Sequence, residues 1–299
     1  MSTSVSPAAG GDPTFRLERT RNFEMASPPM NFTKFLRATT RRALPRRLKP
    51  AVKGVLLRLF ETSGFDCASP LRIGTFKGLR FAYRQGTADE SVLKQTFEDD
   101  VFFSCVPEYQ PSDSDVIVDV GAHIGAFAVL AASKVPRGAV HAIEACQDSF
   151  NFLFVNAAIN RMANLSVYHL ALSDREGDCT LYHDSHNWGH STVLKMSDRT
   201  ETVQCRTLQR FFEKADIPRC TLLKMNCEGA EFPILLASPP EVLRRVRMML
   251  VFYHSDLWTT NSREDVVSHL RASSFECKIR HSGEDRGWIV AVNRNWVGV

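Results

Sequence analysis

Two hydrophobic periods alternate along the chain. Short runs rich in Val, Ile and Leu predict buried strands, and segments whose apolar residues recur every three or four positions predict helices. The predicted strands cover 116–120, 139–145, 165–170, 221–226 and 248–253, and the predicted helices cover 126–134, 147–160, 208–215, 232–236 and 263–272. Strands alternating with helices indicate an α/β fold with a mostly parallel sheet.

Three further features complete this pattern. A hairpin-like pair at 275–280 and 287–293 predicts an antiparallel edge. Short strands at 179–182 and 202–205 flank a polar loop, 184–195. We find no internal repeat.

Composition divides the 299 residues unevenly. Residues 1–60 hold 12 Lys and Arg against 3 Asp and Glu, whereas residues 61–299 hold 25 against 30. The first 30 residues, rich in Ser, Pro, Gly and Ala, are predicted to be disordered. We therefore expect a basic N-terminal extension over 1–60, a segment leading into the sheet over 61–110, and one catalytic domain over 111–299.

The basic residues between 34 and 58 alternate with apolar ones and are interrupted at Pro45 and Pro50. Such an amphipathic stretch suits a membrane surface or a nucleic acid, although it is more often a solvated helix packed on its own domain. Because this charge lies outside the motifs described below, we expect no nucleic-acid partner. Contact of this segment with anionic lipid stays open.

No apolar run approaches the roughly 20 residues that a membrane helix needs, and the N-terminus lacks the hydrophobic core of a secretory signal. These features predict a cytoplasmic protein, with an organelle transit peptide as the alternative. The 8 cysteines are scattered, without a Cys-x-x-Cys pair or a Cys/His cluster at zinc spacing. We therefore expect buried thiols in a reducing compartment and no metal site.

The main candidate site follows the strand at 116–120, where Gly121 and Gly125 lead into a helix. Glycines there let a ligand approach the backbone and the free amides of the helix. Asp119 ends this strand, and Glu144, at the end of the next, is placed to bind ribose hydroxyls. The glycine spacing differs from the Gly-x-Gly-x-x-Gly of dinucleotide-binding enzymes. This difference favours an adenosine ligand without a pyrophosphate, such as S-adenosylmethionine. Alternatively, Asp119 caps the turn and Glu144 is a solvated strand end.

Three motifs identify a family resemblance. Val118-Asp-Val-Gly-Ala-His-Ile-Gly125, Ile143-Glu144 and Leu222-Leu-Lys-Met-Asn-Cys-Glu-Gly-Ala-Glu231 resemble the FkbM-type methyltransferases. These enzymes use S-adenosylmethionine and mostly methylate hydroxyl oxygens of sugars or natural products. The resemblance covers about residues 80–295, and Tyr83–Asp89 with Phe97 resembles the segment before the sheet. It implies a Rossmann-like class I methyltransferase fold, with a mostly parallel seven-stranded sheet, an antiparallel edge hairpin and helices on both faces.

The resemblance also implies cofactor contacts. Glu144 would bind the ribose of S-adenosylmethionine, and Ser173 would approach its adenine. The methionine part would contact Asp119, Gly121, His123 and Gly125. The remaining expected cofactor contacts are Ala122, Ala145 and Asn226. Glu228 and Glu231 match the acidic pair of the second motif. Asn226 stands where the family usually has Asp, and an amide cannot accept a proton at neutral pH.

Methylation of a hydroxyl benefits from a general base near the acceptor oxygen. His254 is the first candidate, because strand ends face the ligand crevice in such sheets; Glu228 is the second, and Asn226 shares the site. His254 could instead cap its strand, and Glu231 could merely favour its helix N-terminus. The loop from His186 to Thr192 suits a polyhydroxylated acceptor, with His186 and His190 as further bases, or is a surface loop whose Trp188 covers the core.

We therefore predict S-adenosylmethionine-dependent O-methylation of a small molecule or glycan. One alternative is a nucleic-acid methyltransferase, although the Asn/Asp-Pro-Pro-aromatic signature of base-amine methylation is absent from the sequence. The other is a catalytically silent relative, suggested by Asn226. The sequence makes no prediction of oligomeric state.

Overall fold

The computed structural model describes residues 69–299 apart from 185–188, 259, 281–282, 284 and 297–299. The basic N-terminal stretch, Cys67, His186 and Trp188 lie outside the described residues. Within the described part, no helix is long and apolar enough to cross a bilayer.

The fold is built on a seven-stranded sheet. Its strands are β3 (Val116–Val120), β4 (Ala139–Glu144), β5 (Leu165–His169), β9 (Cys220–Met225), β10 (Val246–His254), β11 (Phe275–Arg280) and β12 (Arg286–Asn293). They lie in the order β11-β12-β10-β9-β3-β4-β5. β10, β9, β3, β4 and β5 are parallel, and β12 pairs antiparallel with both β10 and β11. The mostly parallel sheet with an antiparallel edge is confirmed.

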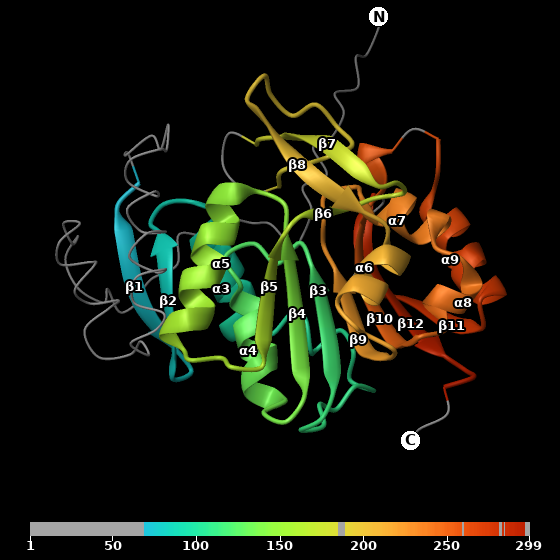
Figure 1. The fold of residues 1–299 in the computed structure, drawn as a ribbon, viewed down its shortest axis with the longest axis horizontal. Coiled ribbons are helices and arrows are strands. Elements are labelled where there is room, and N and C mark those ends of the chain that lie inside the picture. Colours follow the sequence, from blue (N-terminus) through green and yellow to red (C-terminus); the bar gives the residue numbers. More distant parts are fainter. Residues whose placement is uncertain (1–68, 185–188, 259, 281–282, 284, 297–299) are drawn as a thin grey trace, which may run out of the picture.

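Helices cover both faces of this sheet (Figure 1). They are α4 (Ala126–Lys134), α5 (Gln147–Ile159), α6 (Leu208–Lys214), α7 (Glu231–Ala237), α8 (Pro240–Leu243) and α9 (Arg263–Ala272), and a short 3-10 turn, η1 (Ser255–Leu257), follows β10. Alternate residues of β3 separate the two layers: Val118 and Val120 pack with α6 and α7, whereas Ile117 packs with α4. The Rossmann-like class I fold is confirmed.

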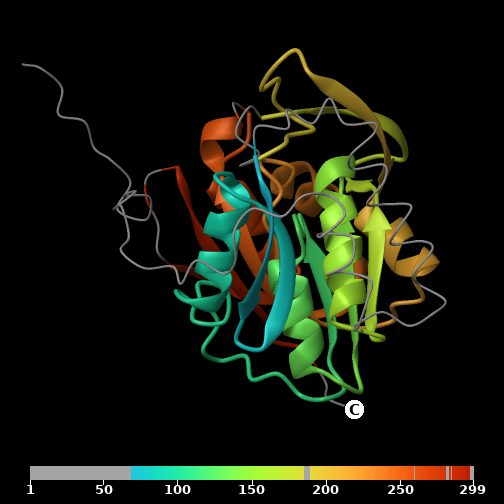
Figure 2. The same cartoon turned by 90° about the vertical axis from the view of Figure 1, so that its left-hand side faces the viewer.

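The segment leading into the sheet contains structure that the sequence pattern did not predict. β1 (Leu71–Phe76) and β2 (Leu79–Arg84) form an antiparallel hairpin, and α3 (Ala88–Phe97) follows it. Figure 2 shows the hairpin on the side of the molecule that α3 and α5 occupy. The amide of Asn156, on α5, fixes it there by accepting from the Ala82 amide at 2.7 Å and donating to Ala82 O at 3.1 Å and Ile124 O at 2.8 Å.

A second sheet lies above the central strands (Figure 1). Its strands are β6 (Ala171–Leu172), β7 (Gly177–Tyr182) and β8 (Thr200–Arg206), in the order β6-β8-β7. The strands expected at 179–182 and 202–205 are therefore a pair in this sheet. Its small core includes Cys146, Ala171, Leu181 and Val203, so it packs directly on the residues that follow β4 and β5.

This second sheet also corrects a prediction about cysteine. Cys179 and Cys205 form a disulfide between β7 and β8, so the expectation that every cysteine is a free thiol, on which the reducing compartment rested, is wrong for this pair. The two cysteines are far apart in sequence, and only the pairing of β7 with β8 brings them together. Cys105, Cys146 and Cys220 are buried thiols as expected, whereas Cys227 and Cys277 are partly exposed.

The hairpin depends on Asn156 for its position. We expect Asn156→Ala to lower the free energy of unfolding by about 3 kcal/mol, because it leaves a buried amide and two buried carbonyls without their partner. Asn151→Ala on the same helix is the matched control. That residue makes a single side-chain bond to Gln147, so we expect a loss of about 1 kcal/mol or less. If urea unfolding showed the same loss of unfolding free energy in the two variants, Asn156 would not be what holds the hairpin.

Candidate functional site

The turn after β3 is shaped by close backbone contact. Gly121 has φ +76°, and a Cβ there would lie 1.9 Å from the carbonyl oxygen of Asn226. Gly125 has φ +85°, and a Cβ there would lie 2.6 Å from a methyl carbon of Leu153. Glycine is thus required at Gly121 by space as well as by conformation, and at Gly125 mainly by conformation, because the end of the Leu153 side chain can move. His123, between them, adopts φ +53°, a sparsely populated conformation of the kind found at functional sites.

Glu144 ends β4 with both carboxylate oxygens engaged. One oxygen accepts from the His123 amide at 2.7 Å and the other from the Cys146 amide at 2.8 Å. Burial raises the pKa of Glu144 to about 7, although the two amides oppose this shift. The carboxylate is therefore held in one orientation with lone pairs left over, and it is not a solvated strand end.

Asp119 lies at the end of β3 as predicted, and its contacts fit the alternative in which it serves the turn. It is fully buried, and its Oδ1 lies 2.9 Å from Nζ of Lys224 on β9, which also donates to Gly121 O at 3.1 Å. Burial raises the pKa of Asp119, and the ammonium of Lys224 opposes this shift. Asp119 therefore orients the turn through Lys224. The sequence signal for Lys224 was a single cation in an otherwise apolar strand.

Two adjoining cavities open beside the glycine turn. The larger has an empty volume of about 650 Å³ including its open mouth, and the smaller about 340 Å³, also including open space. Gly121, His190 and Cys227 line both. Of the predicted residues, the larger cavity is lined by Gly121, Ala122, His123, Glu144, Asn226 and Glu228, and the smaller by Gly121 and Ala145.

Four predicted residues are not among the described residues that line these cavities: Asp119, Gly125, Ser173 and His254. Gly125 begins α4, and Ser173 is tied to β8 through its amide, which donates to Arg206 O at 2.9 Å. The Ser173 hydroxyl donates to its neighbour Asp174 at 2.9 Å. All four nevertheless lie in the elements that build the site, so their contact with the cofactor stays a prediction.

Asn226 lines the larger cavity and carries a buried acceptor. Its side-chain oxygen Oδ1 is buried and has no hydrogen-bond partner among the residues that the structure describes. A buried acceptor without a partner costs about 1–3 kcal/mol. A ligand that donates a hydrogen bond there would remove this cost.

A buried histidine joins the two predicted acidic residues. His254 Nδ1 lies 3.2 Å from Glu231 Oε1, and its Nε2 lies 3.3 Å from Glu228 Oε2. Burial alone would lower the pKa of His254, but the carboxylates of Glu231 and Glu228 outweigh it and raise this pKa. Burial would likewise raise the pKa of Glu231, but His254 and backbone amides lower it overall. These shifts favour the protonated form of His254 between the two carboxylates.

This geometry favours Glu228, the second candidate, over His254 as the general base. A protonated His254 has both nitrogens occupied and no lone pair for an acceptor proton. Glu228, by contrast, lines the larger cavity, and burial raises its pKa although His254 opposes the shift. Glu228 adopts φ +52°, a sparsely populated conformation for a residue other than glycine. The cavity-facing member of the cluster is Glu228, and His254 lies behind it.

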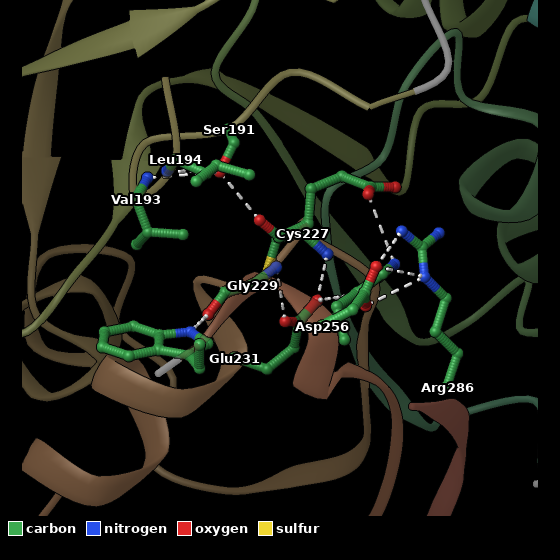
Figure 3. Close-up of polar contacts among 11 residues, drawn as sticks. Ser191, Val193, Leu194, Cys227, Gly229, Glu231, Asp256 and Arg286 are labelled. Atoms are coloured by element: carbon green, nitrogen blue, oxygen red, sulfur yellow. Dashed lines mark hydrogen bonds and ion pairs between the residues drawn. The ribbon is translucent and has the colours of Figure 1, made fainter. Parts of the chain in front are cut away.

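The Glu231 carboxylate organises the backbone of this motif (Figure 3). It accepts from the amides of Cys227 at 2.6 Å and Gly229 at 2.8 Å. Trp258 Nε1 donates to Gly229 O from the segment after β10. Glu231 is thus fixed by specific contacts, and its role goes beyond a favourable charge at a helix N-terminus.

The segment 189–191 covers Glu228. A Cβ at Gly189 would lie 2.2 Å from the Glu228 carboxyl carbon, and Ser191 Oγ donates to Glu228 O at 2.9 Å (Figure 3). His190 Nδ1 accepts from the Asp184 amide at 3.0 Å, and burial with nearby positive groups lowers the pKa of His190 to about 3. His190 is therefore a poor base. Within the predicted loop, the structure places the 189–191 part over the site.

A buried ion pair connects the leading segment to the site. Arg84, on β2, pairs with Asp89 at the start of α3 with Nη2 to Oδ1 at 2.7 Å, and the same oxygen lies 3.6 Å from His123 Nε2. Both partners of the pair are almost fully buried. The segment around Tyr83–Asp89 therefore supports the glycine turn from outside the sheet.

Comparisons with known proteins agree with this architecture. The profile described as the Methyltransferase FkbM domain matches residues 119–277. A curated relative, the AMB antimetabolite synthetase AmbE of Pseudomonas aeruginosa (strain PAO1), is 27% identical over 274 residues. That match covers 76% of this chain but only 13% of the relative.

Solved structures show similar folds at low identity. Methyltransferase FkbM from Methylobacillus flagellatus KT is 14% identical, with a TM-score of 0.45 over 68% of this chain and 53% of that chain. The N-terminal domain of EvdMO1, solved in the presence of SAH and D-fucose, is 12% identical, with a TM-score of 0.44 over 85% of this chain and 98% of that one. These likenesses concern the fold alone.

The close approach of Gly121 to Asn226 gives a direct test. Gly121→Ala should lower the free energy of unfolding by about 4 kcal/mol or more, because the new Cβ forces the ends of β3 and β9 apart. Gly78→Ala is the matched control, since Gly78 has φ +83° but nothing within 4 Å of its Cβ position. It should cost about 1–2 kcal/mol from the left-handed conformation alone. Similar losses in chemical unfolding would show that space at Gly121 is not limiting.

Proposed function

The chain belongs to the Methyltransferase FkbM domain family and is an S-adenosylmethionine-dependent methyltransferase, and we propose that it methylates a hydroxyl oxygen of a sugar, glycan or natural product. The observation that carries this proposal is the Glu228 carboxylate, which faces the larger cavity with the His254 imidazolium behind it. A hydroxyl acceptor must lose a proton, and this carboxylate can take it.

The residues of the cavity fit the cofactor. Gly121 lets the ends of β3 and β9 lie against each other beside the cavity, and the side-chain oxygen of Asn226 is an unused acceptor that suits the ammonium of the methionine part. Glu144 keeps lone pairs for the ribose hydroxyls while two backbone amides fix its orientation. When bound, the cofactor supplies an activated methyl group on a sulfonium.

Methyl transfer then depends on position and on the removal of one proton. Glu228 would accept the proton of the acceptor hydroxyl while that oxygen attacks the methyl carbon. His254 holds Glu228 in place at 3.3 Å and is itself held by Glu231 at 3.2 Å. The 189–191 segment, packed on Glu228, limits water around this carboxylate. We assign Glu228 as the base, His254 as a positioning residue, and Asn226 to binding, where an amide serves as well as a carboxylate.

Cofactor binding tests the first part of this assignment. Calorimetric titration of the wild-type protein with S-adenosylmethionine should show micromolar affinity. Glu144→Gln, which removes the negative charge but keeps the volume, should weaken it by at least about tenfold, or about 1.4 kcal/mol. Glu241→Ala, an exposed acidic residue on α8, is the control and should bind like the wild type. Undiminished binding by Glu144→Gln would remove Glu144 from the cofactor site.

Turnover tests the base. Glu228→Gln should keep cofactor affinity within about threefold but lower turnover by about 10²–10⁴, the range for loss of general base catalysis. Burial raises the pKa of Glu228 above 4.5. As the pH is lowered, wild-type turnover should therefore begin to fall at a pH above 4.5, because Glu228 becomes protonated. Glu228→Gln should not show this acidic fall in turnover. The assay measures S-adenosylhomocysteine formed with free and nucleotide-linked hexoses and 6-deoxyhexoses. Asp256→Asn, which changes a partly exposed neighbour paired with Arg286, is the control and should keep its turnover. Equal losses of turnover in the two variants would reject Glu228 as the base.

A further inference from the structure

We propose that Cys146, His183 and His190 bind one transition-metal ion of the zinc class. One ligand atom from each, a sulfur and two imidazole nitrogens, lies within 4.8 Å of the other two. Cysteine sulfur and histidine nitrogen are donors that zinc prefers. Modest side-chain movement would bring the three atoms to coordination distance, with a water or a carboxylate in the fourth position.

The three ligands come from separate parts of the fold. Cys146 immediately precedes α5, His183 immediately follows β7, and His190 lies in the segment that covers Glu228. Their separations in sequence are too large for a short zinc motif, which explains why the sequence predicted no metal site. The second sheet, packed on the end of β4, brings them together.

The position of Cys146 favours a thiolate ligand. It is the N-cap of α5, a 13-residue helix, and the backbone amide of Ser149 approaches its sulfur. Free amides and the dipole at a helix N-terminus stabilise negative charge on sulfur. Burial nevertheless raises the pKa of the free thiol to about 12. Metal binding would therefore form the metal–sulfur bond with release of the thiol proton to solvent.

His190 supplies a second, independent observation. Its Nε2 is buried and has no hydrogen-bond partner within the described part of the chain, although the ring lies beside two other potential ligands. The Asp184 amide currently donates to Nδ1. Coordination through Nε2 would place the ring proton on Nδ1 and release the Asp184 amide, so one hydrogen bond is exchanged for a metal bond.

His183 stands beside a negative charge that would favour a dication. Glu201 Oε2 lies 3.8 Å from His183 Nε2, while the other Glu201 oxygen accepts from the Gln147 amide at 3.0 Å. Carboxylates in this position orient metal-bound imidazoles and strengthen binding.

A metal here would join the second sheet to the catalytic domain at the edge of the site. His190 lines both cavities, and its neighbour Ser191 bonds to the backbone of Glu228. The ion would thus fix the segment that covers the base. The inference does not depend on O-methylation, because metal binding can be measured without cofactor or acceptor.

The test uses the full chain, untagged, stripped of metal and kept in a non-thiol reductant. Titration with Co²⁺ should saturate at one equivalent and give an absorption band from charge transfer between thiolate and cobalt; Zn²⁺ should displace it. Cys146→Ser should abolish this band, and Glu201→Gln should weaken binding by about 10- to 100-fold. Cys277→Ser, which alters a partly exposed thiol, is the control. It should leave the cobalt band and the metal affinity unchanged.

Three results would overturn the metal site. The first is no saturable binding of either ion to the wild type. The second is an unchanged cobalt band in Cys146→Ser, and the third is a band that disappears only when Cys179 and Cys205 are both replaced by alanine. If Cys146→Ser folds poorly, His183→Gln tests the same site and should lower affinity by at least about tenfold; unaltered affinity there would also reject it. Titration of the metal-free protein with S-adenosylmethionine separates this failure from failure of the cofactor site.

Discussion

The site depends on the buried ion pair between Asp119 and Lys224. These residues lie on the neighbouring strands β3 and β9, and the same ammonium reaches the Gly121 carbonyl. Isolated buried charges are expensive, so each holds the other in place. The pair fixes the spacing between two strand ends, where Gly121 meets the backbone of Asn226 without room for a side chain. Both loops that carry the cofactor-facing groups begin at this point.

A second charged cluster extends this arrangement toward chemistry. Glu231 binds the backbone of its own loop and the imidazole of His254, and His254 in turn binds Glu228. Only Glu228 of these three lines the larger cavity. The buried members therefore hold the position of the cavity-facing carboxylate and influence its pKa.

The sequence predicted much of the fold because the spacing of hydrophobic residues within a short segment indicates whether that segment forms a strand or a helix. The central strands and helices fall close to their predicted bounds, and the hairpin at the antiparallel edge is present. The β1–β2 hairpin and α3 escaped prediction because their position rests on remote partners, including Asn156 on α5. The disulfide was missed for the same reason, since β7 and β8 must pair before Cys179 can meet Cys205.

By itself, the sequence determined where strands end, where glycine is required and which acidic residues follow those strands, because these features depend on residues close together in the chain. The tertiary structure decided which polar groups meet. It paired Asp119 with Lys224 and placed His254 between two carboxylates, which left Glu228 to face the cavity. It also gathered Cys146, His183 and His190 from three segments. Such pairings depend on strand order and on loops crossing at one sheet edge, and neither is encoded in the spacing of any single motif.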